Sequence, residues 1–469
     1  MLFPTLSFLL FFTVVVAVLA MLDGPAAHGW RKRFLVLASY WFYAQWDWRF
    51  CVLLFGSSVW TYGAGLLLGR LAGQGARKAV VAVAVAGHLL LLGLFKYADF
   101  FVESMNSLLH RMGLLRELPF VEFILPVGIS FFTFHGISYV VDVYRRQVEV
   151  CRRLEDMLLY ISFFPQLVAG PIVRAAFFLP QLYAATTRRF DPVPAVLLIL
   201  GGLFKKVVVA NYLATDLVDK VFADPGHVAS LDLLLAGYGY AVQIYCDFSA
   251  YTDIAIGIAA LLGYAFPPNF DQPYRAENLQ DFWRRWHISL SSWLRDYLYK
   301  PLGGSRRGRV RTLVNLMVTM LLGGIWHGAA WKFVAWGALH GGGLVVGRAV
   351  QPLGLFRGAA GRAVAIVLTF HFVCFAWLFF RADSFETVML YLAQLFRMEG
   401  GPLLATPFTL GLIVLGLLMH AVPRDHVQRV AAVVRPLRWW GLAALAAVVV
   451  VAIDALGPEG VAPFIYFRF

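Results

Sequence analysis

A histidine in an apolar segment is the residue of this sequence best placed to do chemistry. His327 lies in the run LLGGIWHGAAW, inside a hydrophobic segment from about Leu313 to Val346. An ionisable side chain at membrane depth is costly and marks a functional site by default. Flanking glycines let another backbone or a substrate approach closely. Because histidine exchanges a proton near neutral pH, we expect His327 to act as a general base.

A second histidine, His287, lies in the run NLQDFWRRWHISLSSWLRDYLYK. Its large apolar residues repeat at helical spacing, and Asn278 with Asp281 forms a capping-box-like start. The run therefore predicts one amphipathic helix over 278–300 that is too charged to span a membrane and lies at an interface or inside a funnel. His287 falls near the border of the apolar stripe, so it is either a partner of His327 or an ordinary interfacial residue.

Polar side chains also interrupt other apolar runs. The stretch QIYCDFSAYTD, from Gln243 to Asp253, predicts either a wet cavity for a polar substrate or a polar cluster that ties helices together, because buried carboxylates must be paired, hydrogen-bonded or protonated. His135, in another apolar run, is more typical of a core histidine. Besides the two catalytic candidates, the residues expected to line a substrate channel are Trp326, Trp331, Asp247, Ser249, Asp253, Trp283 and Arg284.

The composition indicates the scaffold that must position these residues. The chain has 469 residues, of which 60% are hydrophobic and 14% charged, whereas a soluble domain carries about 25% charged residues. Near-uncharged runs long enough to cross a bilayer recur along it, and no polar linker divides it. We expect an all-α polytopic membrane protein with one integral membrane domain over 1–469 and about 10 to 12 spans. The expected spans lie near 1–21, 34–62, 80–101, 123–143, 193–213, 231–262, 313–346, 363–380, 403–419 and 442–453, and several of these runs are long enough for two passes.

Charge and cysteine content exclude other classes. The net charge of +13 is spread over short loops, which is typical of cytoplasmic loops beside anionic lipid and gives no reason to expect nucleic-acid binding. Some basic loops could attract an anionic cosubstrate. The four cysteines lie far apart without metal-ligand spacing, so we expect neither a disulfide framework nor a metal site. The apolar start lacks a positive leading region, which argues against a cleaved signal peptide.

One segment does not have the pattern of a simple span. Between Ile161 and Leu182, three prolines and the Gly170-Pro171 pair interrupt an apolar run. Irregular backbone at membrane depth survives only when it is buried in protein or faces a water-filled cavity. The segment predicts a re-entrant element that lines a cavity, or two short interfacial helices with a bend.

Three runs together resemble the membrane-bound O-acyltransferase family, most closely its bacterial alginate O-acetyltransferase branch. They are YCDFSAYTDIAIGIAALLGY, NFDQPYRAENLQDFWRRWHISLSSWLRDYLYKPLGG and GGIWHGAAWKFVAWGALHG, supported by LPVGISFFTF, FFPQLVAGPI and the C-terminal 464–467. The strongest resemblance covers about 126–340. It implies a ring of tilted helices with re-entrant and interfacial helices around a central funnel and tunnel. It also implies that His327 and His287 are the family's two site residues.

The resemblance implies a function as well. The family moves acyl groups from thioesters to hydroxyls, and in the exporting branches the donor lies inside the cell and the acceptor outside. We therefore expect a multi-pass enzyme of the bacterial inner membrane that O-acetylates an exported polysaccharide such as alginate. Acetyl-CoA would be the donor, with no bound cofactor. A periplasmic or membrane-anchored acetyltransferase would be the partner that completes the transfer.

Two alternatives remain open at this stage. The related branch that passes D-alanine from a carrier protein to teichoic acid shares much of the same sequence frame. A proton-coupled transporter would use intramembrane histidines and carboxylates as a relay, and a broken helical segment suits that class. The sequence shows no evident inverted repeat, which speaks against a transporter.

Overall fold

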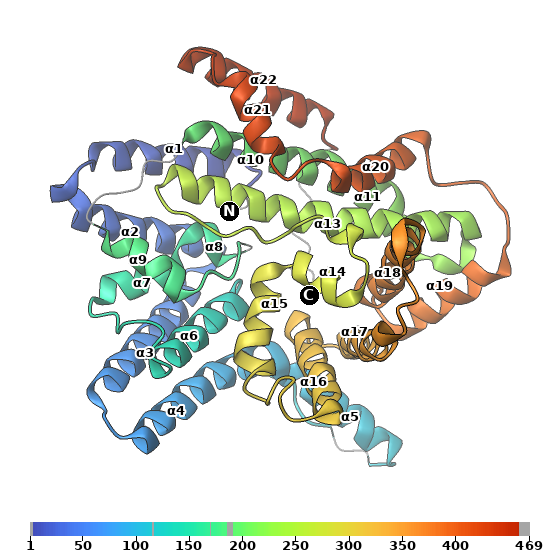
Figure 1. Cartoon of the computed structure of the whole chain (residues 1–469), viewed down its shortest axis with the longest axis horizontal. Helices are drawn as coiled ribbons and strands as arrows, with labels where there is room; N and C mark the ends of the chain where they lie inside the picture. The colour runs from blue at the N-terminus through green and yellow to red at the C-terminus, as the bar shows by residue number, and fades with distance from the viewer. Residues whose placement is uncertain (1–2, 115–116, 169, 185–190, 459–469) are drawn as a thin grey trace. The chain divides into compact units, whose positions relative to one another are not determined.

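The computed structural model describes residues 3–114, 117–168, 170–184 and 191–458, which form helices and no strands (Figure 1). The expected all-α class is confirmed. The chain divides into two compact units, one of residues 1–190 with 259–266 and the other of residues 191–258 with 267–469. The C-terminal motif at 464–467 lies outside the described residues.

Seven helical stretches among the described residues are long and apolar enough to cross a membrane, so the protein is multi-pass. An eighth span results if α20 with its following turn (Pro407–Ala421) and α21 (His426–Val434), bent by 94°, count together. This number is lower than the expected 10 to 12 because the apolar helices α1 (Leu6–Met21) and α22 (Trp439–Leu456) do not meet the same criterion. Neither does α6 (Ile129–Tyr144), which has 16 residues where a span was expected near 123–143. The seven are α3 (Phe50–Arg70), α4 to α5 (Gln74–Arg111), α10 to α12 (Pro192–Ala223), α13 (Ser230–Leu261), α16 (Arg309–His327), α17 with its last turn (Trp331–Leu353) and α18 (Gly358–Arg381).

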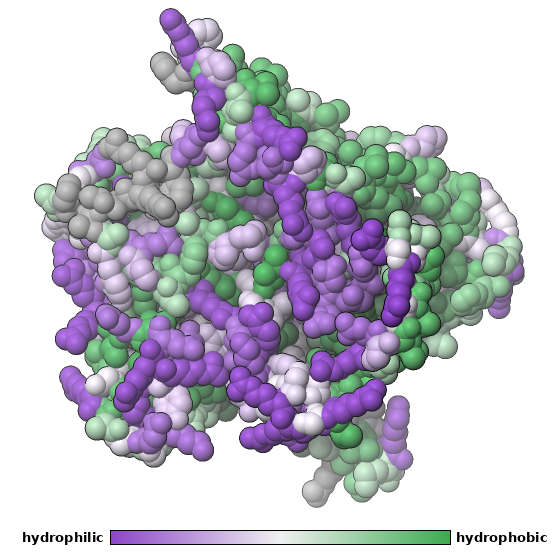
Figure 2. All heavy atoms as spheres, in the orientation of Figure 1, coloured by the Kyte–Doolittle hydropathy of each residue, from purple (hydrophilic) through white to green (hydrophobic). Residues whose placement is uncertain are grey.

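Apolar side chains remain on the outside of these helices, as contact with lipid requires. In the second unit, Met389 and Phe396 of α19 (Phe385–Arg397) are exposed, as are Val414 and Leu418 of α20 (Pro407–Leu418). Figure 2 shows the hydrophobic colour gathered over α19 and α20. Large exposed apolar surfaces are rare on soluble monomers, and here they mark the surface that faces the bilayer.

The broken segment near 161–182 belongs to the core of the first unit. It forms α7 (Leu154–Ser162), α8 (Phe164–Leu167) and α9 (Ala175–Tyr183), so the interruption is confirmed. The ring of Phe163 packs 5.3 Å from Phe178 and 5.1 Å from Tyr264, measured between centroids. Phe163, Phe178 and Tyr264 are buried, which means that this part of the segment packs into protein.

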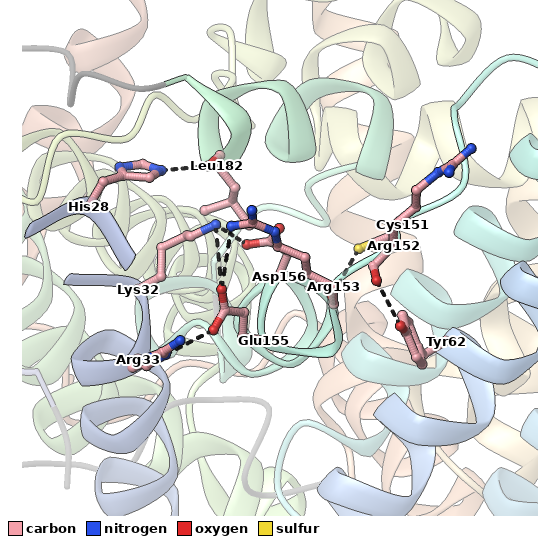
Figure 3. Close-up of polar contacts among 10 residues, drawn as sticks. All are labelled: His28, Lys32, Arg33, Tyr62, Cys151, Arg152, Arg153, Glu155, Asp156 and Leu182. Atoms are coloured by element: carbon pink, nitrogen blue, oxygen red, sulfur yellow. Dashed lines mark hydrogen bonds and ion pairs between the residues drawn. The ribbon is translucent and has the colours of Figure 1, made fainter. Parts of the chain in front are cut away.

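An ion-pair network joins α7 to α2 (His28–Asp47) in the same unit (Figure 3). The buried Lys32 ammonium lies 2.5 Å from the Asp156 carboxylate, and Arg33 donates to Glu155 at 3.1 Å. In α6 (Ile129–Tyr144), His135 is buried against the Tyr160 ring at a centroid distance of 5.4 Å. Its position matches that of a core histidine.

The apolar segment around His327 is a helical hairpin of α16 and α17 rather than one continuous span. The break falls at residues 328–330, and glycines bring the two helices into close contact. A Cβ at Gly324 would lie 2.2 Å from the carbonyl oxygen of Phe333, and one at Gly337 would lie 2.5 Å from that of Met320. Backbone packed this closely against backbone leaves no space for a methyl group.

We therefore expect Gly324→Ala to destabilise the protein by about 1–3 kcal/mol, because a backbone oxygen cannot move aside as a flexible side chain can. The matched control is Gly347→Ala on α17, where nothing lies within 4 Å of the added Cβ. Apparent melting temperatures in detergent report the difference. Equal temperatures for the two variants would refute the packing role of Gly324.

The expected single helix over 278–300 is wrong at its centre. The chain forms α14 (Leu279–Arg285) and α15 (Ile288–Leu294), and His287 between them has a left-handed φ of +43°. Asn269 causes the break, because its carbonyl oxygen accepts from the Ile288 N–H and its side-chain oxygen accepts from the Ser289 N–H, both at 2.9 Å. These bonds replace those that a continuous helix would make. The predicted cap at Asn278 is confirmed, since its side chain accepts from the Asp281 N–H at 2.9 Å.

Candidate functional site

The two predicted histidines both contact the same tryptophan, Trp326, within the second unit. His287 lies between α14 and α15, and His327 is the last residue of α16. The Trp326 ring centroid is 6.1 Å from that of His287 and 5.1 Å from that of His327. The two histidines are 0% and 3% exposed, respectively. Forty positions of sequence thus separate two imidazoles that share an aromatic neighbour.

Asn269 contacts one ring nitrogen of His287 and so influences which nitrogen carries the proton. The Asn269 side-chain oxygen already accepts from a backbone N–H, and His287 Nδ1 lies 3.3 Å from the same oxygen. This contact favours the tautomer in which Nδ1 donates a hydrogen bond and Nε2 keeps its lone pair. Nε2 is buried and has no hydrogen-bond partner among the described residues. A neutral imidazole of this kind can accept a hydrogen bond from a substrate hydroxyl.

Burial lowers the pKa of His287 to about 3, below the value of about 6.5 in an unfolded chain. The unfolded state therefore binds a proton that the folded state does not, so the stability contribution is complete above about pH 6.5 and is lost as the pH falls toward 3. We expect acidification from pH 7 to 5 to reduce the stability of the wild type by up to about 2 kcal/mol more than that of His287→Asn. Asparagine tolerates the left-handed backbone and makes a fair comparison. The expectation is wrong if the melting temperatures of the two proteins fall by the same amount between pH 7 and pH 5.

Aromatic rings from three helices surround His327. Its centroid lies 5.0 Å from that of Trp336 on α17 and 5.2 Å from that of Phe380 on α18, both edge-on. The helices α14, α16 and α18 each pack against α17 (Figure 1). A Cβ at Gly328 would lie 2.0 Å from the Phe333 ring, so the residue after His327 must be glycine in this packing. His327 is buried among aromatic rings, and burial strengthens any electrostatic interaction made there.

A third histidine of this cluster was not predicted from the sequence. His340, on α17, is fully buried, and its ring lies 4.6 Å from Trp336 and 5.3 Å from Trp283. Trp336 therefore touches both His327 and His340. The signal was present in the sequence, because His340 falls in the same apolar segment as His327 and meets the same criterion of an ionisable residue at membrane depth.

The predicted carboxylates are paired with two consecutive lysines that sequence reasoning also missed. Lys205 contacts Asp253 at 2.6 Å and Ser249 at 2.8 Å, and Lys206 contacts Asp247 at 2.6 Å. The lysines occupy a π-helical turn within the α10 to α12 span. These ion pairs support the helix-tying alternative for the run from Gln243 to Asp253. Two lysines inside an apolar run were the signal, since each needs an acidic partner.

The remaining channel candidates divide into two groups. Trp326 and Trp283 are buried within the histidine cluster, and Phe248 of α13 reaches His287 with a centroid distance of 4.6 Å. Trp331, which is 58% exposed, and Arg284, which is also exposed, lie on the surface. The structure therefore places two of the seven candidates beside the buried histidines and three in the lysine pairs. No group of three potential metal ligands occurs among the described residues.

The geometry supports acid–base chemistry by buried imidazoles that aromatic rings surround. Residues 152–388 match the membrane-bound O-acyltransferase family. The chain is 40% identical over 392 residues to a probable alginate O-acetylase of Pseudomonas syringae pv. tomato, which covers 82% of this chain and 73% of the relative.

Two further relatives have other names. A peptidoglycan O-acetyltransferase of Helicobacter pylori is 36% identical over 79% of this chain and 74% of its own length. A teichoic acid D-alanyltransferase of Bacillus subtilis is 30% identical over 55% of this chain and 69% of its own length. The chain is therefore an O-acyltransferase and belongs to the membrane-bound O-acyltransferase family.

Proposed function

We propose that this enzyme takes an acetyl group from a cytoplasmic thioester, acetyl-CoA. The acetyl group crosses the bacterial inner membrane and is used to O-acetylate an exported polysaccharide. The observation that carries the proposal is that two buried imidazoles, those of His287 and His327, both contact Trp326. Relatives named for acetyl transfer align over about four-fifths of the chain, whereas the D-alanyl relative aligns over 55%. This difference favours acetyl over D-alanyl as the transferred group.

In the proposed reaction His327 acts as the general base. Its imidazole takes the proton of the acceptor hydroxyl while the hydroxyl oxygen attacks the thioester carbonyl carbon. The carbon–sulfur bond then breaks, and the thiolate leaves with the proton that His327 held. Base assistance increases the rate of transfer by about 10²- to 10⁴-fold. Holding donor and acceptor together supplies the larger part of the rate enhancement.

His287 has a positioning role in this proposal. Its Nδ1 is held by Asn269, so its Nε2 lone pair can accept a hydrogen bond from a second hydroxyl of the acceptor. Sugars supply neighbouring hydroxyls, which suits a polysaccharide acceptor. The same tautomer cannot donate from Nε2 to the thioester carbonyl, so orientation of the acceptor is favoured over polarisation of the donor. A periplasmic or membrane-anchored acetyltransferase would take the acetyl group if the final ester is made outside.

The test is to delete the gene and compare the acyl groups of secreted and wall polymers by NMR. We expect O-acetyl groups to disappear from one polymer and to return when the wild-type gene is supplied. Loss of D-alanyl esters instead would replace acetyl by D-alanyl in the proposal. Unchanged acylation, together with substrate conduction by purified protein in liposomes without acyl transfer, would establish a transporter.

A further inference from the structure

The rings around His340 form an aromatic cluster, here called the His340 cluster, within the second unit. His340 is fully buried, and charged side chains are absent from its ring contacts among the described residues. Its neighbours come from α14, α17 and α18. Their centroids lie between 4.6 and 6.4 Å from that of His340, and they are Trp336, Trp283, Phe372, Phe282 and Trp377.

Four nitrogens of this cluster have no hydrogen-bond partner among the described residues. They are Nδ1 and Nε2 of His340 and the indole Nε1 atoms of Trp283 and Trp336. Buried polar atoms are almost always hydrogen-bonded, so each exception needs an explanation. A phenylalanine at position 340 would fill the same space, and only the two indole nitrogens would then remain unsatisfied. Packing alone therefore does not account for an imidazole at this position.

The hydrogen-bond donors and acceptors among these nitrogens indicate what kind of ligand group could bind there. A neutral imidazole offers one donor and one acceptor, and each indole offers one donor. Donors outnumber acceptors by three to one, and no ring contact supplies a charge to balance an ion. The matching guest is neutral and rich in acceptors, which describes a carbonyl group. A charged carboxylate or phosphate would be buried without a counter-charge.

The position of the cluster connects it to the proposed base. Trp336 contacts His327 at 5.0 Å and His340 at 4.6 Å, so a guest at His340 lies one indole away from His327. We propose that His340, with Trp283 and Trp336, binds a carbonyl oxygen of the neutral acyl-bearing arm of the thioester donor. This inference rests on the proposed acyl transfer and assigns the donor side of that site.

The test measures donor kinetics with purified protein in lipid nanodiscs, using acetyl-CoA as the probe. His340→Phe keeps the ring and removes both nitrogens, and we expect it to raise KM for acetyl-CoA at least tenfold with kcat within threefold. His340→Gln keeps one donor and one acceptor and should bring KM back to within threefold of the wild type. Trp336→Phe removes a single N–H and should give an intermediate increase.

The matched control is His135→Phe in the first unit. His135 is also buried, and both of its ring nitrogens likewise lack partners among the described residues, but it lies outside the His340 cluster. We expect its KM to equal that of the wild type. An unchanged KM in His340→Phe, or an equal change in both phenylalanine variants, would overturn the proposal.

A binding measurement separates failure of this inference from failure of the proposed function. The Kd of acetyl-CoA is determined on His327→Ala and on His327→Ala combined with His340→Phe, so that turnover does not interfere. We expect at least tenfold weaker binding by the double variant. If the wild type neither binds nor turns over acetyl-CoA, the proposed donor is wrong. If the wild type binds and turns over acetyl-CoA, but the double variant binds it as tightly as His327→Ala does, only the proposed role of His340 is wrong.

Discussion

His327→Ala is expected to lower kcat for acyl transfer by about 10²- to 10⁴-fold, because no other group of the site takes the proton of the attacking hydroxyl. The reaction is followed as acyl groups transferred by purified protein, normalised to its amount in the membrane. His327→Gln should be as inactive as the alanine variant. Glutamine preserves polarity and approximate size but cannot accept a proton near neutral pH.

The control for this prediction is a buried histidine with a structural contact. His88 is buried in the first unit and lies 3.1 Å from the Thr61 hydroxyl. His88→Ala therefore measures what is lost when a buried imidazole is removed without touching the proposed site, and we expect transfer within threefold of the wild type. Transfer by folded His327→Ala within tenfold of normal would remove His327 from the role of base.

Removing one side of the Lys206–Asp247 pair is expected to destabilise the protein by about 3–5 kcal/mol, because an uncompensated charge is left in the interior. The side chains of Lys206 and Asp247 are 2% and 5% exposed, and their charged atoms lie 2.6 Å apart. Lys206→Met leaves the carboxylate alone, and Asp247→Leu leaves the ammonium alone. Both should lower the apparent melting temperature and the amount of protein in the membrane.

The neighbouring pair provides the matched comparison. Lys205 and Asp253 have the same contact distance of 2.6 Å, but their side chains are 13% and 31% exposed. Water screens that pair, so Lys205→Met should cost clearly less than Lys206→Met. The double variant Lys206→Met with Asp247→Leu should recover most of the lost stability, because well-packed apolar residues can replace a buried ion pair. Equal losses in all variants would contradict the role of burial.

The sequence predicted the class and the chemistry of this protein better than its local geometry. Long apolar runs and sparse charge suffice to indicate a multi-pass helical protein, because bilayer thickness sets span length. His327 was recognisable because an ionisable group in such a run is costly. The cap at Asn278 was recognisable because it depends on residues three positions apart.

Long-range contacts could not be predicted in the same way. The break before α15 depends on Asn269, which lies 18 positions before His287 and outside the amphipathic run. The lysine partners of Asp247 and Asp253 lie more than 40 positions earlier, on a different span. The sequence does not show where the apolar run 313–346 divides into α16 and α17, because glycines that allow close helix contact have no hydrophobic signature.

The two lysine–aspartate pairs also bear on how the chain enters the bilayer. Each lysine near the middle of the α10 to α12 span disfavours insertion of that span on its own by about 2.5–3.5 kcal/mol, and α13 carries the complementary carboxylates. Once paired, the two helices present no net charge from these four residues to the lipid. We therefore expect the α10 to α12 span to enter the lipid most readily together with α13, after α13 has been synthesised.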